Sequence, residues 1–173
     1  LDRFDAVRPV RTWAEALGWL AGVEPERPIG EVQFWGHGKW GRVLVDGDPL
    51  DVSDLEAGAE RRGALEVIRE RLVGPEALVW FRTCETFGCE AGHAFARRWA
   101  DFLECRVASH TYIIGPYQSG LHVLGPGESP EWPVDEGLVE GTPAAPEKAA
   151  WSTPGKPNTI FCLTSRLPAW SRR

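Results

Sequence analysis

Two short apolar runs constrain this chain most, because each one stops abruptly just before a residue with reactive chemistry. The run at residues 32–35 (Val-Gln-Phe-Trp) ends just before His37, and the run at residues 77–81 (Ala-Leu-Val-Trp-Phe) ends just before Cys84. Runs of this length and composition are typical of buried strands in a parallel sheet. Parallel strands carry catalytic and binding groups at their carboxyl ends. A histidine and a cysteine in such places indicate a base and a thiol nucleophile.

Helices and strands alternate around these two runs. Apolar residues at helical spacing predict helices over residues 11–22 and 89–103, the first of them ended by Gly22. A third strand is expected at residues 106–109. The order strand, helix, strand, helix, strand implies right-handed crossovers and a mainly parallel sheet.

Two further segments have a weaker pattern. Ser53 and Glu56 have the spacing of a capping box, which predicts a helical stretch from there towards Leu72. Residues 140–158 are rich in Pro, Ala, Gly and Lys and are predicted to form a flexible Pro-rich loop. We therefore expect one domain over residues 1–173, with that loop as its irregular part.

The composition limits the partners and the location. A chain of 173 residues with 43% hydrophobic residues can form one domain with a core. A net charge of -6 argues against nucleic-acid binding, and no stretch approaches the roughly 18 apolar residues of a membrane span. The start of the chain lacks the features of a signal peptide. Four scattered cysteines suit a reduced chain, so we expect a cytoplasmic location.

The chemistry of His37 and Cys84 depends on forming a thiolate, because a protonated thiol is a poor nucleophile. Two features are expected to lower the pKa of Cys84: His37 itself, and the positive end of the helix predicted from residue 89. Gly38 permits close backbone approach, and its N–H, together with that of Cys84, is predicted to form an oxyanion hole. Glu85 works against this, because a carboxylate beside a thiol opposes ionisation.

The order of these motifs resembles the caspase-like cysteine peptidases, the fold of caspases, gingipains, separase and the CHAT domains. The resemblance rests on a strand ending in His37 and Gly38, a connection containing a helix, and a strand ending in Cys84, 47 residues after the histidine. Residues 92–96 (Gly-His-Ala-Phe-Ala) and 107–111 (Val-Ala-Ser-His-Thr) are similar to an uncharacterised bacterial branch of that fold.

The resemblance implies an α/β three-layer sandwich with a mainly parallel caspase-like sheet. Its N-terminal strand is missing or reduced here, because little precedes the helix at residues 11–22. It implies Cys84 as the nucleophile, His37 as the catalytic histidine and Gly38 as an oxyanion donor. Arg82 falls where caspases place a glutamine that lines the S1 pocket, so an acidic P1 side chain is expected. The implied activity is that of a cysteine endopeptidase, a hydrolase of peptide or protein substrates that needs no cofactor.

Two alternatives stay open. The chain can be a catalytically inactive caspase-like interaction domain that binds a partner through its Trp-bearing loops. It can also be a zinc-bearing structural domain, because Cys84, Cys89 and His93 have the spacing Cys-x4-Cys-x3-His and His37 could be a fourth ligand. Cys89 and His93 lie away from the apolar stripe of their helix and are expected to face solvent, so no metal site is predicted.

His110 and His122 follow or fall within predicted strands near the same edge of the sheet, and we interpret them as ordinary surface histidines rather than substrate contacts. The sequence leaves open the substrate, the oligomeric state and the way activity is controlled. An upstream regulatory segment or a partner protein are both compatible with it.

Overall fold

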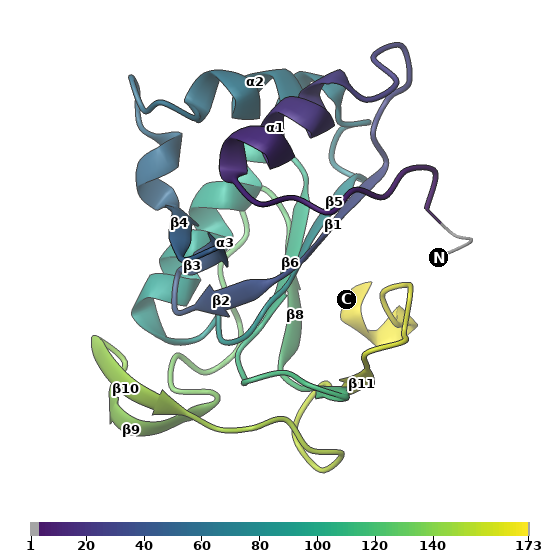
Figure 1. The fold of residues 1–173 in the computed structure, drawn as a ribbon. Helices are drawn as coiled ribbons and strands as arrows, with labels where there is room; N and C mark the ends of the chain where they lie inside the picture. Colours follow the sequence, from purple (N-terminus) through teal and green to yellow (C-terminus); the bar gives the residue numbers. More distant parts are fainter. Residues whose placement is uncertain (1–3, 173) are drawn as a thin grey trace.

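The strands predicted from the two apolar runs lie side by side in a four-stranded sheet (Figure 1). A computed structural model describes residues 4–172. The sheet has the order β1-β5-β6-β8 and consists of β1 (Glu31–Trp35), β5 (Leu78–Arg82), β6 (Arg106–His110) and β8 (Leu121–Leu124). The pairs β1–β5 and β5–β6 are parallel, and β6–β8 is antiparallel. The predicted α/β class with a mainly parallel sheet is confirmed.

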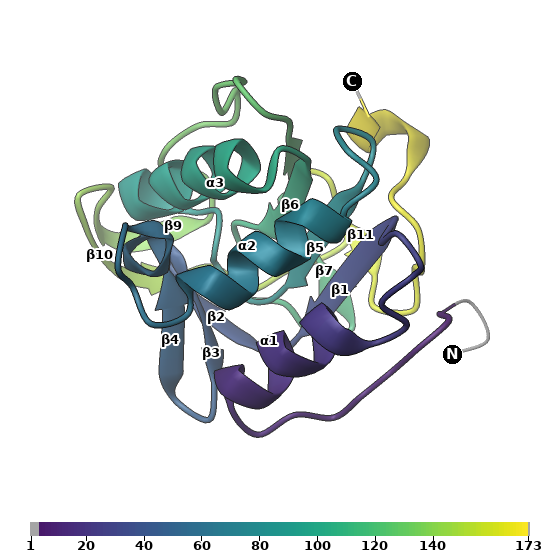
Figure 2. The same ribbon diagram turned by 90° about the horizontal axis from the view of Figure 1, so that it is seen from above.

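Three α-helices in the described part of the chain share one core with this sheet. They are α1 (Trp13–Gly22), α2 (Arg62–Arg71) and α3 (Cys89–Leu103), and α2 lies between the other two (Figure 2). Their apolar side chains pack with Val79, Phe81 and Val107 of the sheet. The predicted helices at residues 11–22 and 89–103 are thus confirmed. Within residues 4–172, no helix combines the length and the apolar character needed to cross a membrane.

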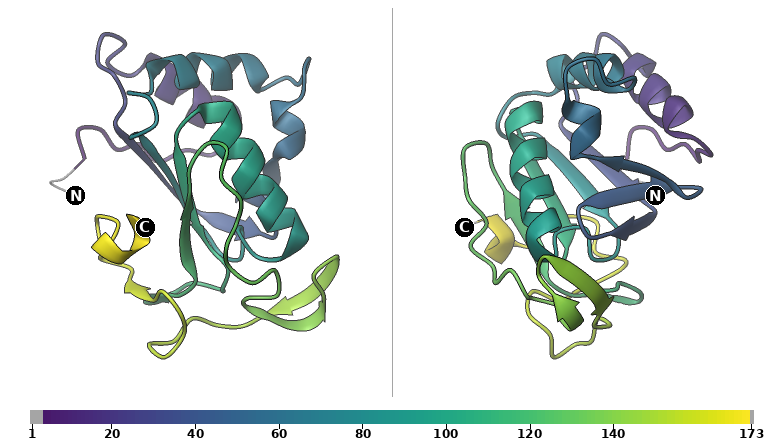
Figure 3. Two further views of the ribbon diagram at one scale, coloured as in Figure 1. Left: turned by 180° about the vertical axis from the view of Figure 1, so that it is seen from behind. Right: turned by 90° about the vertical axis from the view of Figure 1, so that its left-hand side faces the viewer.

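The other face of the sheet is covered by the C-terminal segment. Leu78, Trp80 and Ala108 point to this face and pack with Ile160 and Leu167. The segment also forms β11 (Ile160–Phe161), which pairs with β7 (Tyr117–Gln118), and the 3-10 helix η2 (Ala169–Arg172). It lies on the side of the sheet away from α3 (Figures 1 and 3).

Besides the β11–β7 pair, two other small antiparallel sheets accompany the main one in residues 4–172. β2 (His37–Lys39), β3 (Arg42–Val45) and β4 (Asp48–Asp51) form one, and β9 (Leu138–Thr142) with β10 (Ala145–Ala149) forms the other. The loop predicted over residues 140–158 therefore includes most of a hairpin. Its irregular pairing, with register shifts in β10, explains why the residues show no regular strand pattern.

The predicted capping box at Ser53 and Glu56 is wrong. The residue that caps is Asp51, whose carboxylate accepts from the Ser53 N–H at 2.8 Å while the Asp54 carboxylate accepts from the Asp51 N–H at 2.9 Å. This box opens only the short 3-10 helix η1 (Val52–Leu55). Asp is as good an N-cap as Ser. The pairs Asp51–Asp54 and Ser53–Glu56 both have capping-box spacing, and the first of them forms.

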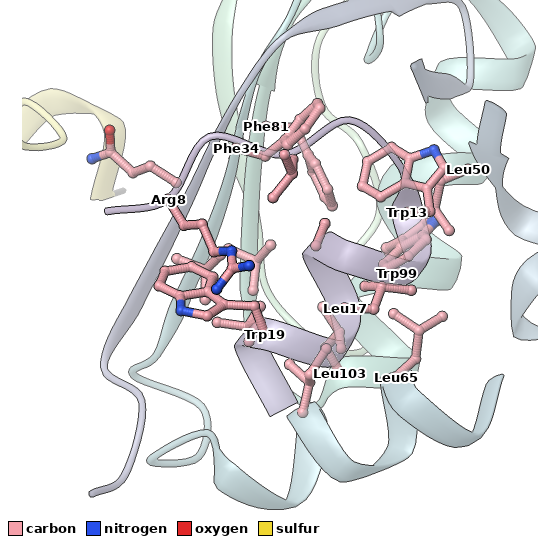
Figure 4. Close-up of a pocket in the computed structure, with 17 residues that line it drawn as sticks. Arg8, Trp13, Leu17, Trp19, Phe34, Leu50, Leu65, Phe81, Trp99 and Leu103 are labelled. Carbon is pink, nitrogen blue, oxygen red and sulfur yellow. The ribbon is translucent and has the colours of Figure 1, made fainter. Parts of the chain in front are cut away.

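β1 is an edge strand, so the expectation that it is buried holds only in part, and Trp35 at its end is 54% exposed. An apolar pocket of about 130 Å³ lies between β1, α1 and the segment that precedes α1 (Figure 4). Trp13 and Phe34 line it, with their ring centroids 5.0 Å apart. Trp99 and Leu103 of α3 and Leu65 of α2 also line it, so the pocket lies where the three helices meet the sheet.

Replacing Phe95 tests how much the aromatic core contributes to the free energy of unfolding. This fully buried ring stacks on Trp99 and meets Phe81 edge-on, with centroids 5.3 Å away in both cases. We expect Phe95→Ala to lower the free energy of unfolding by about 3–5 kcal/mol in urea titrations followed by circular dichroism. The exposed Val139→Ala is the control and should change it by less than about 0.5 kcal/mol. Equal effects of the two substitutions would contradict this description of the core.

Candidate functional site

The register of β1 on β5 brings His37 and Cys84 to the same edge of the sheet. Trp35 and Arg82 are the last paired residues of the two parallel strands. His37 and Cys84 each follow two positions later, so the chain leaves the sheet at matching points. His37 is exposed and begins β2, and Cys84 is partly buried in the turn between β5 and α3.

Gly38 packs directly against the turn that holds Cys84. A Cβ atom at Gly38 would lie 2.8 Å from the Cys84 carbonyl oxygen and 2.7 Å from Thr83 Cβ, and closer still to Thr86 Oγ1. Real Cβ atoms essentially never come this close to other heavy atoms, so only glycine fits here. The contact shows that the His-Gly segment and the cysteine turn are neighbours.

Hydroxyl groups hold the cysteine turn in place. Thr83 Oγ1 and Thr86 Oγ1 lie 2.7 Å apart, and Ser109 Oγ is 3.4 Å from the first of them. Thr86 Oγ1 is also 3.2 Å from the carbonyl oxygens of Cys84 and Arg42. All three hydroxyl residues are fully buried. Through Arg42 the network joins the turn to β3, and the sequence patterns gave no sign of it.

The surroundings of Cys84 favour the protonated form of its thiol. Ile114 donates its N–H to Cys84 Sγ at 3.4 Å. Burial raises the pKa of Cys84 most, and the Glu85 carboxylate raises it further, while the Ile114 hydrogen bond and Lys39 act to lower it. On balance the pKa of Cys84 is raised, so the expectation that His37 and the positive end of α3 give it a lowered pKa is wrong. The expected opposition from Glu85 is confirmed.

Glu85 is a buried carboxylate with one cation beside it. Its backbone is in the left-handed region (φ 58°) and its N–H donates to the Tyr112 carbonyl at 3.0 Å. The side chain is 6% exposed, and one of its carboxylate oxygens lies 3.2 Å from Lys39 Nζ. The Lys39 ammonium lies 4.0 Å from the centroid of the Trp40 ring. Neither Lys39 nor Trp40 was predicted as part of the site.

Arg82 is a buried residue that ties the C-terminal segment to the sheet. Its guanidinium donates to the Thr164 carbonyl (2.5 Å), the Gln118 side-chain oxygen (2.7 Å) and the Cys162 carbonyl (3.0 Å). It also stacks between Trp35 and Trp80, 4.0 and 4.2 Å from their centroids. Its side chain is therefore directed towards the C-terminal segment, to which it is hydrogen-bonded.

The residues considered for zinc are not brought together. Cys89 is 1% exposed and packs with Trp40 and Ala149, so the expectation that it faces solvent is wrong. The helix begins at Cys89 with φ 63°, which turns its side chain away from the helical pattern used for the prediction. His93 meets the Trp132 ring edge-on at 5.1 Å. Within residues 4–172, no three His, Cys, Asp or Glu side chains are arranged to hold a metal.

His110 and His122 are not surface histidines. His110 is fully buried, with its Nδ1 3.1 Å from the Ser119 carbonyl oxygen, and burial lowers its pKa to about 3. His122 Nε2 lies 2.6 Å from the Glu136 carboxylate, which also accepts from Thr111 Oγ1 at 2.6 Å. Burial acts to raise the pKa of Glu136, but these two partners lower it on balance. Both histidines therefore make structural contacts, His110 with Ser119 and His122 with Glu136.

Comparison with protein-family models, with curated proteins and with solved structures finds no match to this chain.

Gly38→Ala tests the contact with the cysteine turn. The added methyl group would overlap the Cys84 carbonyl and Thr83, and we expect it to lower the free energy of unfolding by about 1–3 kcal/mol. Gly30→Ala is the matched control, because a Cβ there meets nothing within 4 Å. Chemical denaturation measures both. A Gly38→Ala protein as stable as the control would show that the two segments are not in contact.

His110 makes stability depend on pH in a defined direction. Its pKa is about 3 in the folded chain against 6.5 for an ordinary histidine, so between these values only the unfolded chain binds the proton. The stability is fully present above pH 6.5 and is lost as pH falls, by about 1.4 kcal/mol per pH unit. Urea titrations between pH 6 and 4 should show a slope smaller by about this amount in His110→Asn. Equal slopes would contradict a neutral, buried His110.

Proposed function

We propose that this chain hydrolyses peptide bonds with Cys84 as the nucleophile and His37 as the base. The observation that supports it best is the packing of Gly38 against the Cys84 turn, at the carboxyl ends of two parallel strands in register. A base and a thiol at one edge of a sheet are the arrangement that nucleophilic catalysis needs.

The raised pKa of Cys84 defines how such a reaction would start. The thiol is protonated at neutral pH, so His37 would remove its proton as the sulfur attacks the substrate carbonyl. The N–H groups of Gly38 and Cys84 would stabilise the oxyanion. His37 would then give the proton to the leaving amine, and water would hydrolyse the thioester and release the second product.

The fold we propose for this function is the caspase-like three-layer sandwich over the whole chain. In support, the helices cover one face of the sheet and the C-terminal segment with η2 covers the other. Within the described residues β1 is the edge strand of the sheet, and Ile29 before it forms an isolated bridge with Leu72. The four free cysteines support a cytoplasmic site of action.

A second candidate is the catalytically inactive interaction domain. It is favoured by the raised pKa of Cys84 and by the carboxylate of Glu85 next to it, since both reduce the thiolate available at neutral pH. In that case the same surface would bind a partner without cleaving it.

Cleavage of an unfolded protein separates the two candidates. Wild type, Cys84→Ala and His37→Ala are incubated with reduced, denatured casein, and the peptides are identified by mass spectrometry. We expect cleavage by wild type and a loss of at least about 100-fold in both variants, the usual contribution of acid–base catalysis being 100-fold or more. Cys162→Ala, another partly exposed cysteine, is the control and should cleave like wild type. Cleavage that survives Cys84→Ala, or none by wild type, would contradict the proposal.

A further inference from the structure

The charged pair beside Cys84 is a cation site that the chain fills with its own lysine. The Lys39 ammonium lies 3.2 Å from an oxygen of the Glu85 carboxylate and 4.0 Å from the centroid of the Trp40 ring. Glu85 and Trp40 are buried, at 4% and 8% exposed. A buried carboxylate and an aromatic face together favour an ammonium or guanidinium group.

Lys39 is the member of this pair that can leave. Its side chain is 45% exposed and has a flexible four-carbon stem, so its ammonium can return to water at little cost. Glu85 cannot do the same, because it is buried and its backbone is fixed by hydrogen bonds to Tyr112 and Gly88. Within residues 4–172, Lys39 is the one cation in an ion pair with Glu85. The Glu85 carboxylate therefore needs a cation beside it, and a cation other than Lys39 can serve.

Because Lys39 can leave and Glu85 cannot, the site discriminates between basic and acidic substrate side chains. A basic substrate side chain can replace Lys39 and leave Glu85 paired. An acidic side chain could only pair with Lys39 by drawing it away, which would leave a buried carboxylate without a partner at a large energetic cost. Arg82, from which the sequence predicted an acidic P1 residue, is bonded to the C-terminal segment and Gln118 and so does not offset this.

We propose that Glu85 and Trp40 bind a lysine or arginine side chain next to the scissile bond, and that Lys39 holds this place when no substrate is bound. Glu85 follows Cys84 and Lys39 follows Gly38 in the sequence, and both charges act on the Cys84 thiol, so we assign the bound side chain to a residue flanking the bond that is cleaved. The inference rests on the proposed peptidase function and names its substrate class.

Two series of internally quenched peptides test this, one varied before and one after the scissile bond among Lys, Arg, Gln and Glu. In at least one series, wild type should cleave the Lys or Arg peptide with a kcat/KM about tenfold or more above the Glu peptide. Glu85→Gln should reduce this ratio to about twofold or less, because the carboxylate that selects the cation is gone. Lys39→Gln should increase it, because the internal competitor is removed.

Glu90→Gln is the matched control, since Glu90 is an exposed carboxylate in the first turn of α3, and it should keep the wild-type ratio. Circular dichroism checks that each variant is folded, and Lys39→Gln gives a second reading of the same site. Cys84-dependent cleavage with no preference for basic residues, or with a preference that Glu85→Gln leaves unchanged, would overturn this inference and leave the proposed function standing. A wild-type chain that cleaves none of the peptides would overturn both.

Discussion

The parallel pairing of β1 with β5 is the constraint on which the candidate site depends. Five pairs, from Glu31 with Leu78 to Trp35 with Arg82, fix the points at which the two strands leave the sheet. A slip by one residue would turn the side chains of a strand to the opposite face. Phe81 would then leave the core it shares with Phe95 and Trp99. The aromatic core therefore holds the register, and the register holds Gly38, next to His37, against the Cys84 turn.

Much of the framework could be predicted because its patterns are strong. The apolar stripe of α3 and the continuous apolar run of β5 gave their bounds to within a residue. The pairing of the two strand ends also followed from the sequence, since parallel strands present their carboxyl ends together. The contact of Gly38 with the cysteine turn agrees with that prediction.

The rest depends on tertiary contacts that local patterns do not contain. His110 reads as a strand-end residue, but β8 and Ser119 cover it completely. Cys89 was placed by helical periodicity, although it is the first residue of α3 and has a left-handed backbone. Lys39 could not be assigned to the site, because only the fold of β2 brings it to Glu85.

The groups around Cys84 act on the pKa of its thiol in opposite directions. Burial and Glu85 raise the pKa of the thiol and so favour its protonated form. A protonated thiol is less easily oxidised than a thiolate. Lys39 partly offsets Glu85 and acts to lower the same pKa. A basic substrate side chain at Glu85 would supply the same positive charge. Exchange of Lys39 for the substrate cation would therefore leave the charge around the thiol unchanged.

The most direct measurement of the central claim is covalent labelling of Cys84 by peptide acyloxymethyl ketones, which need both a bound peptide and a reactive thiolate. Reagents with Lys, Asp or Leu in the P1 position are incubated with wild type and His37→Ala, and the modified residue is identified by mass spectrometry. We expect Cys84 to be labelled in preference to Cys162, the other partly exposed cysteine, and His37→Ala to abolish most of the labelling. Labelling at the same rate in His37→Ala, or spread equally over Cys84 and Cys162, would contradict the central claim.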